Sequence, residues 1–333
     1  MLTRILKSIK KRGARGFLES AYVDSMVKTE RLLIKLRDHR SKFHFVDRSS
    51  GKKTLVIILA GYKPFLWPAT LERIKKYCSK EMDVCIAVSG KDSTELQSMC
   101  RTNNWSYLST TKNSPGIALN KAILSHPDAD KIFMLDEDIF IGDGFFQLLL
   151  DGYQMAWQKF GLEPGFCAPL LNLNGISYLS FLKQKNLEAE YTQEFGTPIL
   201  KCDGIPIHNS GAAAQWIWRQ TLPFDQTVSH FSSKDAHQFA SATRFSIGAI
   251  LFTREFFNKI GGFRSSWKPA TLGEDEDGIC RDCVSMSRPI YVVENVLAGH
   301  FSFYLQEHEM RKYLPEMSLL DPITFPQEYY SKL

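Results

Sequence analysis

The chain has 333 residues, of which 44% are hydrophobic and 23% are charged, so a disordered or fibrous chain is excluded. The formal net charge of +5 is uneven, because residues 1–42 contain 12 Lys/Arg and 4 Asp/Glu, a local charge of +8. The rest of the chain is slightly acidic, and we expect no nucleic-acid partner. Seven scattered cysteines form no disulfide framework, and no apolar stretch approaches the roughly 18 residues of a spanning helix. These features favour a cytoplasmic protein.

Residues 1–46 are predicted to be helical, with an interruption at Gly13 and Gly16. Apolar side chains recur at helical spacing between basic ones, namely Leu2, Ile5, Leu6 and Ile9. A basic amphipathic helix can lie on an anionic membrane surface, which would make the protein peripheral on the inner membrane face. The alternative is a helix that packs on its own domain and leaves its charges in water.

Beyond the polar linker 47–53, strands alternate with helices. The predicted strands are 54–60, 83–88, 105–108, 131–135, 245–252 and 291–293. The predicted helices are 68–79, 93–103, 113–125 and 254–260. This alternation predicts an α/β fold with a mainly parallel sheet and right-handed crossovers. Residues 150–245 give an irregular pattern that we cannot assign.

Two acidic clusters indicate the chemistry. The triplet Asp136-Glu137-Asp138 directly follows the strand at 131–135, and the run Glu274-Asp275-Glu276-Asp277 comes much later. An α/β sheet places its ligands at the carboxyl ends of its strands. Carboxylates there can bridge Mg²⁺ or Mn²⁺ to substrate phosphates, and the second cluster can supply a general base. Together the clusters predict group transfer from a phosphate-activated donor.

Several motifs, in this order, resemble inverting GT-A glycosyltransferases of the family 2 type. They are the strand Leu55–Leu59 with its following turn, Asn113-x-x-Gly116-x-x-x-Asn120, the DxD-like Asp136-Glu137-Asp138, the run from Ser246 to Phe263 followed by the ED-like Glu274-Asp275, and Gly299-His300. The resemblance covers residues 53–305. It implies a Rossmann-like GT-A domain at 51–305 between a basic N-terminal helical extension (1–50) and a C-terminal tail (306–333).

The resemblance also implies roles for single residues. Asp136 and Asp138 would hold Mn²⁺ or Mg²⁺ with His300 as a third ligand, and Asp275 would be the general base beside Glu274, with Asp277 as the alternative. The nucleotide would be contacted by Ala60, Gly61, Tyr62, Asp92, Asn113, Gly116, Asn120, Asp136 and Glu137. Asp92 departs from the family pattern, because Ser89-Gly90-Lys91 shifts it along the loop.

Each of these residues also has a structural interpretation. The triplet at 136–138 could be a solvated loop, and an acidic run suits a helix N-terminus. Asn113 could be a helix cap, and His300 could be a structural histidine. Trp267 could stack on a sugar or an isoprenoid carrier, or it could belong to the core.

The implied function is metal-dependent transfer, with inversion, from a nucleotide sugar, most simply a UDP-sugar, to a hydroxyl of a glycan or lipid-linked acceptor. Surface polysaccharide synthesis fits this activity. A nucleotidyltransferase is one alternative, although the glycine-rich triphosphate loop near the first strand is missing. A non-catalytic carbohydrate-binding protein with a degenerate GT-A fold is another, and the intact Asp136, Asp138 and Asp275 argue against it.

Overall fold

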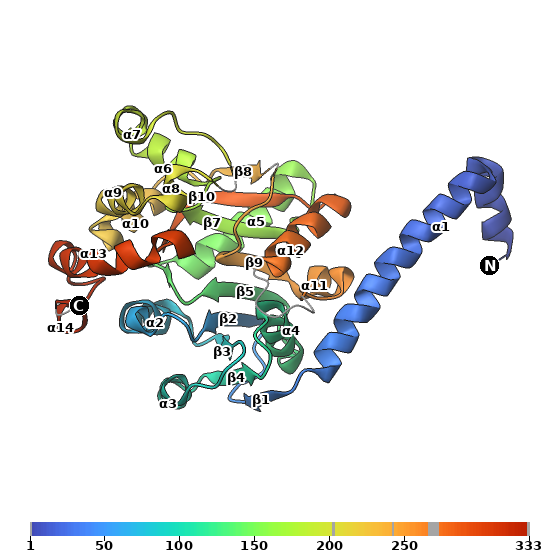
Figure 1. The fold of residues 1–333 in the computed structure, drawn as a ribbon, viewed down its shortest axis with the longest axis horizontal. Coiled ribbons are helices and arrows are strands. Elements are labelled where there is room, and N and C mark those ends of the chain that lie inside the picture. The colour runs from blue at the N-terminus through green and yellow to red at the C-terminus, as the bar shows by residue number, and fades with distance from the viewer. Residues whose placement is uncertain (1, 202–203, 242, 266–272, 332–333) are drawn as a thin grey trace.

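The computed structural model describes residues 2–201, 204–241, 243–265 and 273–331, and these form a mixed α/β fold around one central sheet (Figure 1). The side chains of residues 2–9, 12, 17, 24, 27 and 37 are not described. The predicted apolar set Leu2, Ile5, Leu6 and Ile9 therefore lies outside the described side chains, and Trp267 lies outside the described residues.

The sheet is largely parallel, as predicted. Its strands in the described chain follow the order β1-β4-β3-β2-β5-β9-β7-β10-β6, and β8 pairs with β10. The parallel part near the N-terminus consists of β4 (Ser106–Thr110), β3 (Met82–Val88), β2 (Thr54–Ala60) and β5 (Lys131–Asp136). An antiparallel strand, β9 (Ala249–Thr253), joins β5 to β7 (Phe166–Leu171), which runs parallel to β10 (Ile290–His300). The antiparallel additions are β1 (Phe43–Val46), β6 (Ile139–Phe140) and β8 (Gln238–Ser241).

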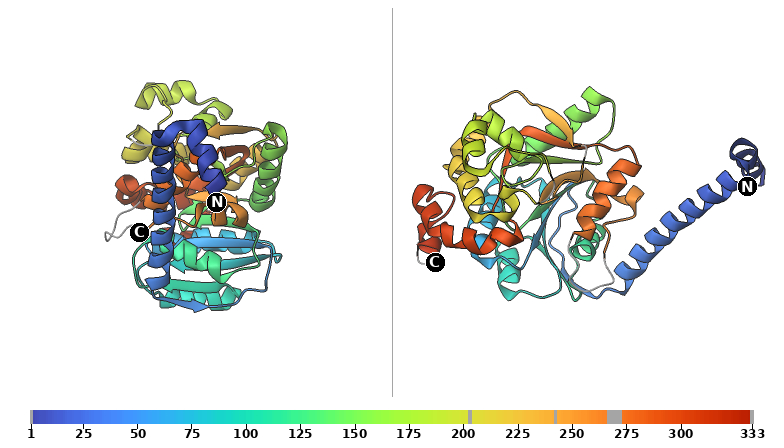
Figure 2. Two further views of the ribbon diagram at one scale, coloured as in Figure 1. Left: turned by 90° about the vertical axis from the view of Figure 1, so that its right-hand side faces the viewer. Right: turned by 45° about the horizontal axis from the view of Figure 1, so that its top comes forward.

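Helices lie on both faces of the sheet (Figure 2). Those of the first half are α2 (Trp67–Tyr77), α3 (Thr94–Asn103), α4 (Pro115–Ser125) and α5 (Phe145–Phe160). The irregular region folds into α6 (Tyr178–Gln184), α7 (Glu188–Phe195), α8 (Pro206–Asn209), α9 (Gly211–Thr221) and α10 (Phe224–Ser232). The chain continues with α11 (Arg254–Ile260), α12 (Glu274–Ser285), α13 (Glu307–Leu320) and α14 (Gln327–Tyr330), and with the short 3₁₀ helices η1 (Pro64–Leu66) and η2 (Tyr304–Gln306).

The predicted element boundaries agree best with the structure where the local sequence signals are strong. The strand at 54–60 and the helix at 254–260 have the predicted bounds. The prediction of helix up to residue 46 is wrong at its end, because residues 43–46 pair antiparallel with β4 as β1. This pairing supplies hydrogen-bond partners to the edge of β4, a tertiary effect that helical spacing does not reveal.

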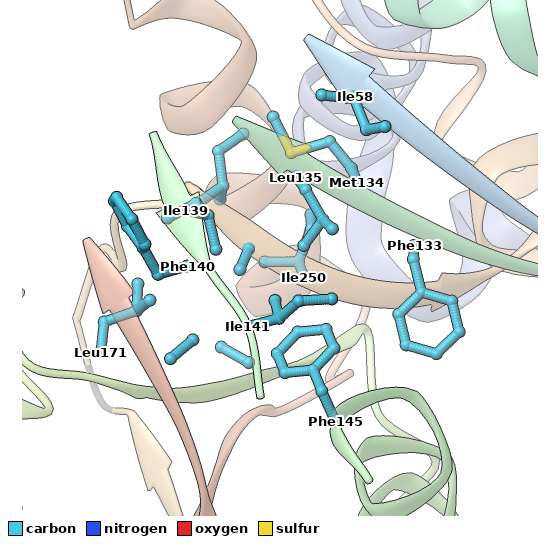
Figure 3. Packing of buried hydrophobic residues seen from close by; sticks show 14 of the residues in the cluster. Ile58, Phe133, Met134, Leu135, Ile139, Phe140, Ile141, Phe145, Leu171 and Ile250 are labelled. Carbon is cyan, nitrogen blue, oxygen red and sulfur yellow. The ribbon is translucent and has the colours of Figure 1, made fainter. Parts of the chain in front are cut away.

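The hydrophobic core fixes the end of β5. Phe133 and Leu135 of β5 are fully buried, with Ile250 of the neighbouring β9 and Phe145 of α5 packed around them (Figure 3). Phe133 and Leu135 lie on one face of β5, and Ile132 and Met134, which are also buried, lie on the other, so β5 is packed on both of its faces. Asp136, the last residue of β5, is thereby held at a fixed place at the edge of the core.

Helix α1 (Leu2–Arg40) projects away from the rest of the molecule (Figure 1). Its backbone is non-helical at Gly13, where φ is 73° and ψ is 166°. Near its other end, Ile34 is buried and Glu30 binds Arg264. Within the described chain, no helix combines the length and the apolar character needed to cross a membrane.

The C-terminal helices pack on the body of the protein. Arg219 of α9 donates a hydrogen bond to the Tyr313 hydroxyl of α13, and the Phe224 amide donates to Asp321. The boundaries at residues 50 and 305 stay predictions.

Candidate functional site

The predicted site lies at the carboxyl ends of β2, β3 and β5. Asp136 ends β5, and its backbone amide donates a hydrogen bond to the Gly248 carbonyl at 2.8 Å. Gly248 lies beside the Asp136 carboxylate, since a Cβ there would make an ordinary van der Waals contact with Oδ2 at 3.5 Å. Burial raises the pKa of Asp136 well above its usual value, and the charges of Asp138 and Asp275 raise it further. Three carboxylates from two distant segments therefore interact here.

Glu137 faces away from its two neighbours and holds the loop after β2. Its buried carboxylate accepts hydrogen bonds from the backbone amides of Gly61 at 2.9 Å and Tyr62 at 2.7 Å. The Trp67 indole donates a third bond to it at 2.6 Å. The carboxylate thus fixes the shape of the loop at the end of β2, and this is the role that the structure gives to Glu137.

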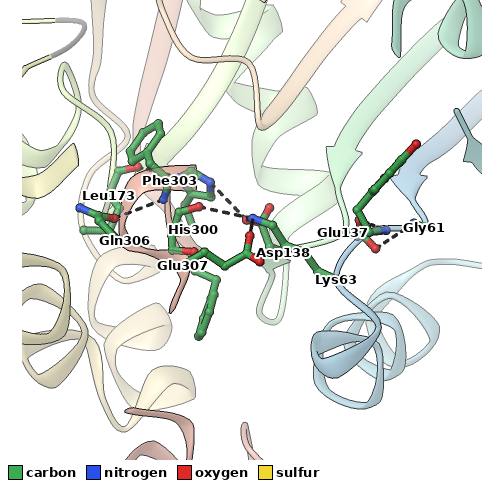
Figure 4. A network of polar contacts seen from close by, with 12 residues as sticks. Gly61, Lys63, Glu137, Asp138, Leu173, His300, Phe303, Gln306 and Glu307 are labelled. Carbon is green, nitrogen blue, oxygen red and sulfur yellow. Dashed lines mark hydrogen bonds and ion pairs between the residues drawn. The ribbon is translucent and has the colours of Figure 1, made fainter. Parts of the chain in front are cut away.

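Asp138 is paired with a lysine that the sequence analysis did not single out. The Lys63 Nζ atom lies 2.5 Å from Asp138 Oδ2 and 3.4 Å from Glu307 Oε2 (Figure 4). Burial alone would raise the pKa of Asp138, but the Lys63 ammonium and His300 outweigh it and hold this pKa well below its usual range. Burial would likewise lower the pKa of Lys63, but the Asp138 and Glu307 carboxylates hold it above its ordinary value.

His300 also converges on Asp138. Its Nε2 atom lies 3.4 Å from Asp138 Oδ2, and its Nδ1 atom lies 3.0 Å from the Leu173 carbonyl (Figure 4). A carbonyl can only accept, so Nδ1 donates to Leu173 and Nε2 is the ring nitrogen that faces Asp138. A carbonyl behind the ring is the arrangement that orients metal-binding histidines.

The donor chemistry of Asp136, Asp138 and His300 fits a divalent cation, but the Lys63 ammonium competes with such a cation for the Asp138 carboxylate. Carboxylate oxygens and a neutral imidazole both bind such ions. Among the residues that the structure describes, no group of three or more His, Cys, Asp or Glu side chains is arranged as a metal site. A metal ion at Asp138 therefore has to displace the Lys63 ammonium.

Helix α12 presents its acidic residues in different directions. Burial raises the pKa of Asp275 to about 6, and Asp275 in turn affects Asp136 electrostatically. Glu276 and Asp277 instead form ion pairs with Arg244, at 2.5 Å and 2.9 Å. Glu274 and Asp277 line a cavity of about 350 Å³ beside α1. Of the predicted catalytic residues, Asp275 is the one that the structure brings into electrostatic contact with Asp136.

The predicted nucleotide loops of β2, β3 and β4 lie against one another. The Tyr62 hydroxyl donates to the Ser89 carbonyl at 2.6 Å, and the Ser89 hydroxyl lies 3.2 Å from Asn113 Oδ1. Gly90 has a φ of 78°, and a Cβ there would lie 2.4 Å from Asn113 Cβ. Asp92 is exposed and accepts a hydrogen bond from Tyr107 at 2.5 Å, which lowers the pKa of Asp92.

Gly116 and Asn120 have structural roles. A Cβ on Gly116 would lie 2.2 Å from the Arg264 carbonyl, so only glycine permits this contact. The Asn120 side chain is fully buried and binds both the amide and the carbonyl of Phe263, at 2.8 Å and 2.9 Å. Both side-chain positions are taken up by contacts within the protein, and the nucleotide contacts expected of Gly116 and Asn120 stay predictions.

Lys63 and Asn172 are the site residues that sequence reasoning missed. The Asn172 side chain accepts a hydrogen bond from the His300 backbone amide at 2.8 Å. Asn172 lies inside the irregular region 150–245 that could not be assigned, so it gave no signal. Lys63 did give one, because it directly follows Gly61-Tyr62 in the turn after the first strand.

Comparison with known proteins gives remote structural matches. No protein-family profile matches the sequence, and no curated protein matches it either. GalNAc-T7 in complex with UDP, GalNAc and Mn²⁺ is similar at 11% identity and a TM-score of 0.47, over 76% of this chain and 45% of that one. The mannosyltransferase PcManGT from Pyrobaculum calidifontis, in complex with GDP-Man and Mn²⁺, matches at 11% identity and a TM-score of 0.45, over 90% and 72%. Residues 1–349 of TarS from S. aureus match at 11% identity and a TM-score of 0.44, over 80% and 64%. The chain thus spans less than half of the GalNAc-T7 chain.

Proposed function

We propose that this protein is a GT-A glycosyltransferase that moves a sugar from a nucleotide sugar, most simply a UDP-sugar, to a hydroxyl group with inversion. One observation carries the proposal. Asp136 at the end of β5 interacts electrostatically with Asp138 and with Asp275 from the start of α12, about 140 residues later in the chain. Such an arrangement suits the transfer of a group from a diphosphate leaving group to an acceptor that needs deprotonation.

The donor would lie over the ends of β2, β3 and β5. The loop residues Gly61 and Tyr62, held by Glu137, would face the nucleotide together with Asn113 and Asp92. Lys63 brings a partly buried positive charge to the same place. A hard divalent cation, Mn²⁺ or Mg²⁺, would be held by Asp136, Asp138 and His300, where it would neutralise charge on the departing diphosphate.

Asp275 would be the general base. As the acceptor oxygen attacks the anomeric carbon, its proton passes to the Asp275 carboxylate, and the bond from that carbon to the diphosphate oxygen breaks. Attack from the side opposite the leaving group inverts the anomeric centre. A pKa of about 6 suits this role, because the carboxylate is ionised near neutral pH and yet is a stronger base than an ordinary aspartate.

The acceptor that we propose is a glycan or a lipid-linked glycan, in the synthesis of a surface polysaccharide at the inner face of a membrane. The charge of +8 on residues 1–42 supports this location, since anionic lipids attract basic segments.

A screen of nucleotide sugars tests the proposal by measuring released nucleotide and the anomeric configuration of the product. We expect one donor to be used, and Asp275→Asn to lower transfer about 10²–10⁴-fold, the usual contribution of a general base. Nucleotide binding by calorimetry should be unchanged in this variant. Asp277→Asn is the matched control and should stay active. An active Asp275→Asn with an inactive Asp277→Asn would move the base by two residues, and a retained configuration would exclude the inverting scheme.

A further inference from the structure

The projecting part of α1 carries a strip of exposed apolar side chains. Leu18, Tyr22, Leu32 and Leu36 are 66%, 67%, 57% and 39% exposed. With Ser25 and Thr29 between them, they follow one another at alternating steps of three and four residues, which places them along one face of a helix. We call Leu18, Tyr22, Leu32 and Leu36 the α1 strip.

The α1 strip faces away from the rest of the protein. Ile34, which is 1% exposed, lies two positions from both Leu32 and Leu36. Two positions correspond to about 200° around a helix, so the buried residue and the strip lie on opposite sides. Glu30 binds Arg264 and Arg281 at 2.8 Å, which fixes the rotation of α1 about its axis. The helix is also seen to extend away from the sheet in Figure 1 and in the right-hand view of Figure 2.

Basic residues accompany the strip. Lys28 and Lys35 are exposed and lie four residues before and three residues after Leu32, so they share one flank of the strip. Lys10, Lys11 and Arg15 are exposed further toward the N-terminus. An apolar face bordered by positive charge is typical of helices that lie in the interface of an anionic bilayer.

We infer that the α1 strip is a docking surface for an anionic lipid bilayer, with Leu18, Tyr22, Leu32 and Leu36 entering the headgroup region. A second copy of the chain is a poorer fit to the same strip. Two copies would bring together two segments of charge +8 each, and Ser25 and Thr29 would interrupt the apolar contact. The inference deepens the proposed function, because it places the enzyme where a lipid-linked acceptor would be, but docking itself requires neither donor nor acceptor.

Vesicle co-sedimentation of the full chain tests the inference. The wild-type protein should pellet with vesicles of phosphatidylcholine and phosphatidylglycerol at low salt, and much less with phosphatidylcholine alone or at high salt. The variant Leu18→Ser/Tyr22→Ser/Leu32→Ser/Leu36→Ser should lose at least about tenfold in partitioning, because two buried CH₂ groups already correspond to that factor. Leu319→Ser/Ile323→Ser is the control, since these side chains are 71% and 75% exposed on another part of the surface.

The outcomes separate the possible partners. Equal pelleting of the strip variant and the wild type would overturn the inference, as would wild-type protein that stays in the supernatant at low salt. Light scattering that shows a wild-type dimer, reduced to a monomer by the strip substitutions, would assign the strip to a second copy and overturn it as well. Docking by a protein that uses no nucleotide sugar would leave the inference standing and remove the proposed function instead.

Discussion

Three consecutive acidic residues at the end of β5 have three different environments. Asp136 lies among other carboxylates, Glu137 accepts hydrogen bonds from the loop after β2, and Asp138 is paired with Lys63. Successive side chains leave the strand end in different directions, so each meets a different neighbour. The middle residue thus supports the loop, while the outer two remain available for chemistry.

The pH dependence of transfer should report the state of Asp275. Burial raises the pKa of this carboxyl from 3.8 to about 6, so it is protonated below that pH and cannot accept a proton from the acceptor. The rate should therefore fall about tenfold per pH unit below pH 6 and level off above it. Initial rates between pH 4.5 and 8 measure this. Asp277→Asn should keep the profile, and a rate that is flat through pH 6 would contradict the assignment.

Replacing Lys63 should strengthen metal binding. Lys63→Met removes the ammonium from Asp138 Oδ2 and leaves that carboxylate buried without its cation. Breaking a buried ion pair costs about 3–5 kcal/mol, so the variant should unfold at lower temperature. Mn²⁺ should restore part of this loss, since a ligand that binds only the folded state stabilises it.

The double variant Lys63→Met/Asp138→Asn is the control for this effect. It lacks both charges and should show no Mn²⁺-dependent rise in melting temperature. Tighter Mn²⁺ binding by the wild type than by Lys63→Met, measured by electron paramagnetic resonance, would show that Lys63 does not compete with the metal.

At the scale of elements, the sequence predicts best what is decided locally. The strand β2 is a continuous apolar run, and α11 follows its N-cap Thr253, whose side chain accepts a hydrogen bond from the Phe256 amide. The strand β1 was missed because its pairing partner is β4, more than 60 residues away. The helices between residues 172 and 240 are short, and their apolar residues pack on β10 and on one another in ways that no local period reveals.

The candidate site also combines residues that local patterns can place with residues that depend on distant parts of the chain. The carboxylates of Asp136, Asp138 and Asp275 could be placed at one edge of the sheet from their position after a strand and at a helix start. Asn120 could not be placed, because its partners, the amide and carbonyl of Phe263, lie 143 residues away. Lys63 could not be assigned to Asp138 for the same reason, since the two residues are 75 positions apart and follow two different strands, β2 and β5.

At the scale of the whole molecule, Arg73 joins the first half of the chain to the C-terminal segment. This side chain of α2 is 5% exposed. It donates hydrogen bonds to the Ile141 carbonyl at 2.6 Å and to the Thr324 hydroxyl at 3.1 Å, and it pairs with Asp225 of α10. One planar guanidinium thus satisfies groups from three segments, and the residues after 305 take part in the packing of the body.

Arg73→Met should therefore destabilise the whole protein. The substitution leaves the Ile141 carbonyl and the Thr324 hydroxyl without their donor, and each buried polar group left without a partner costs about 1–3 kcal/mol. We expect the free energy of unfolding in urea to fall by at least about 2 kcal/mol. Lys75→Met is the control, because it removes an exposed ion pair with Glu72 and should change the free energy by less than about 1 kcal/mol. Equal effects of the two substitutions would mean that Arg73 does not hold the C-terminal segment in place.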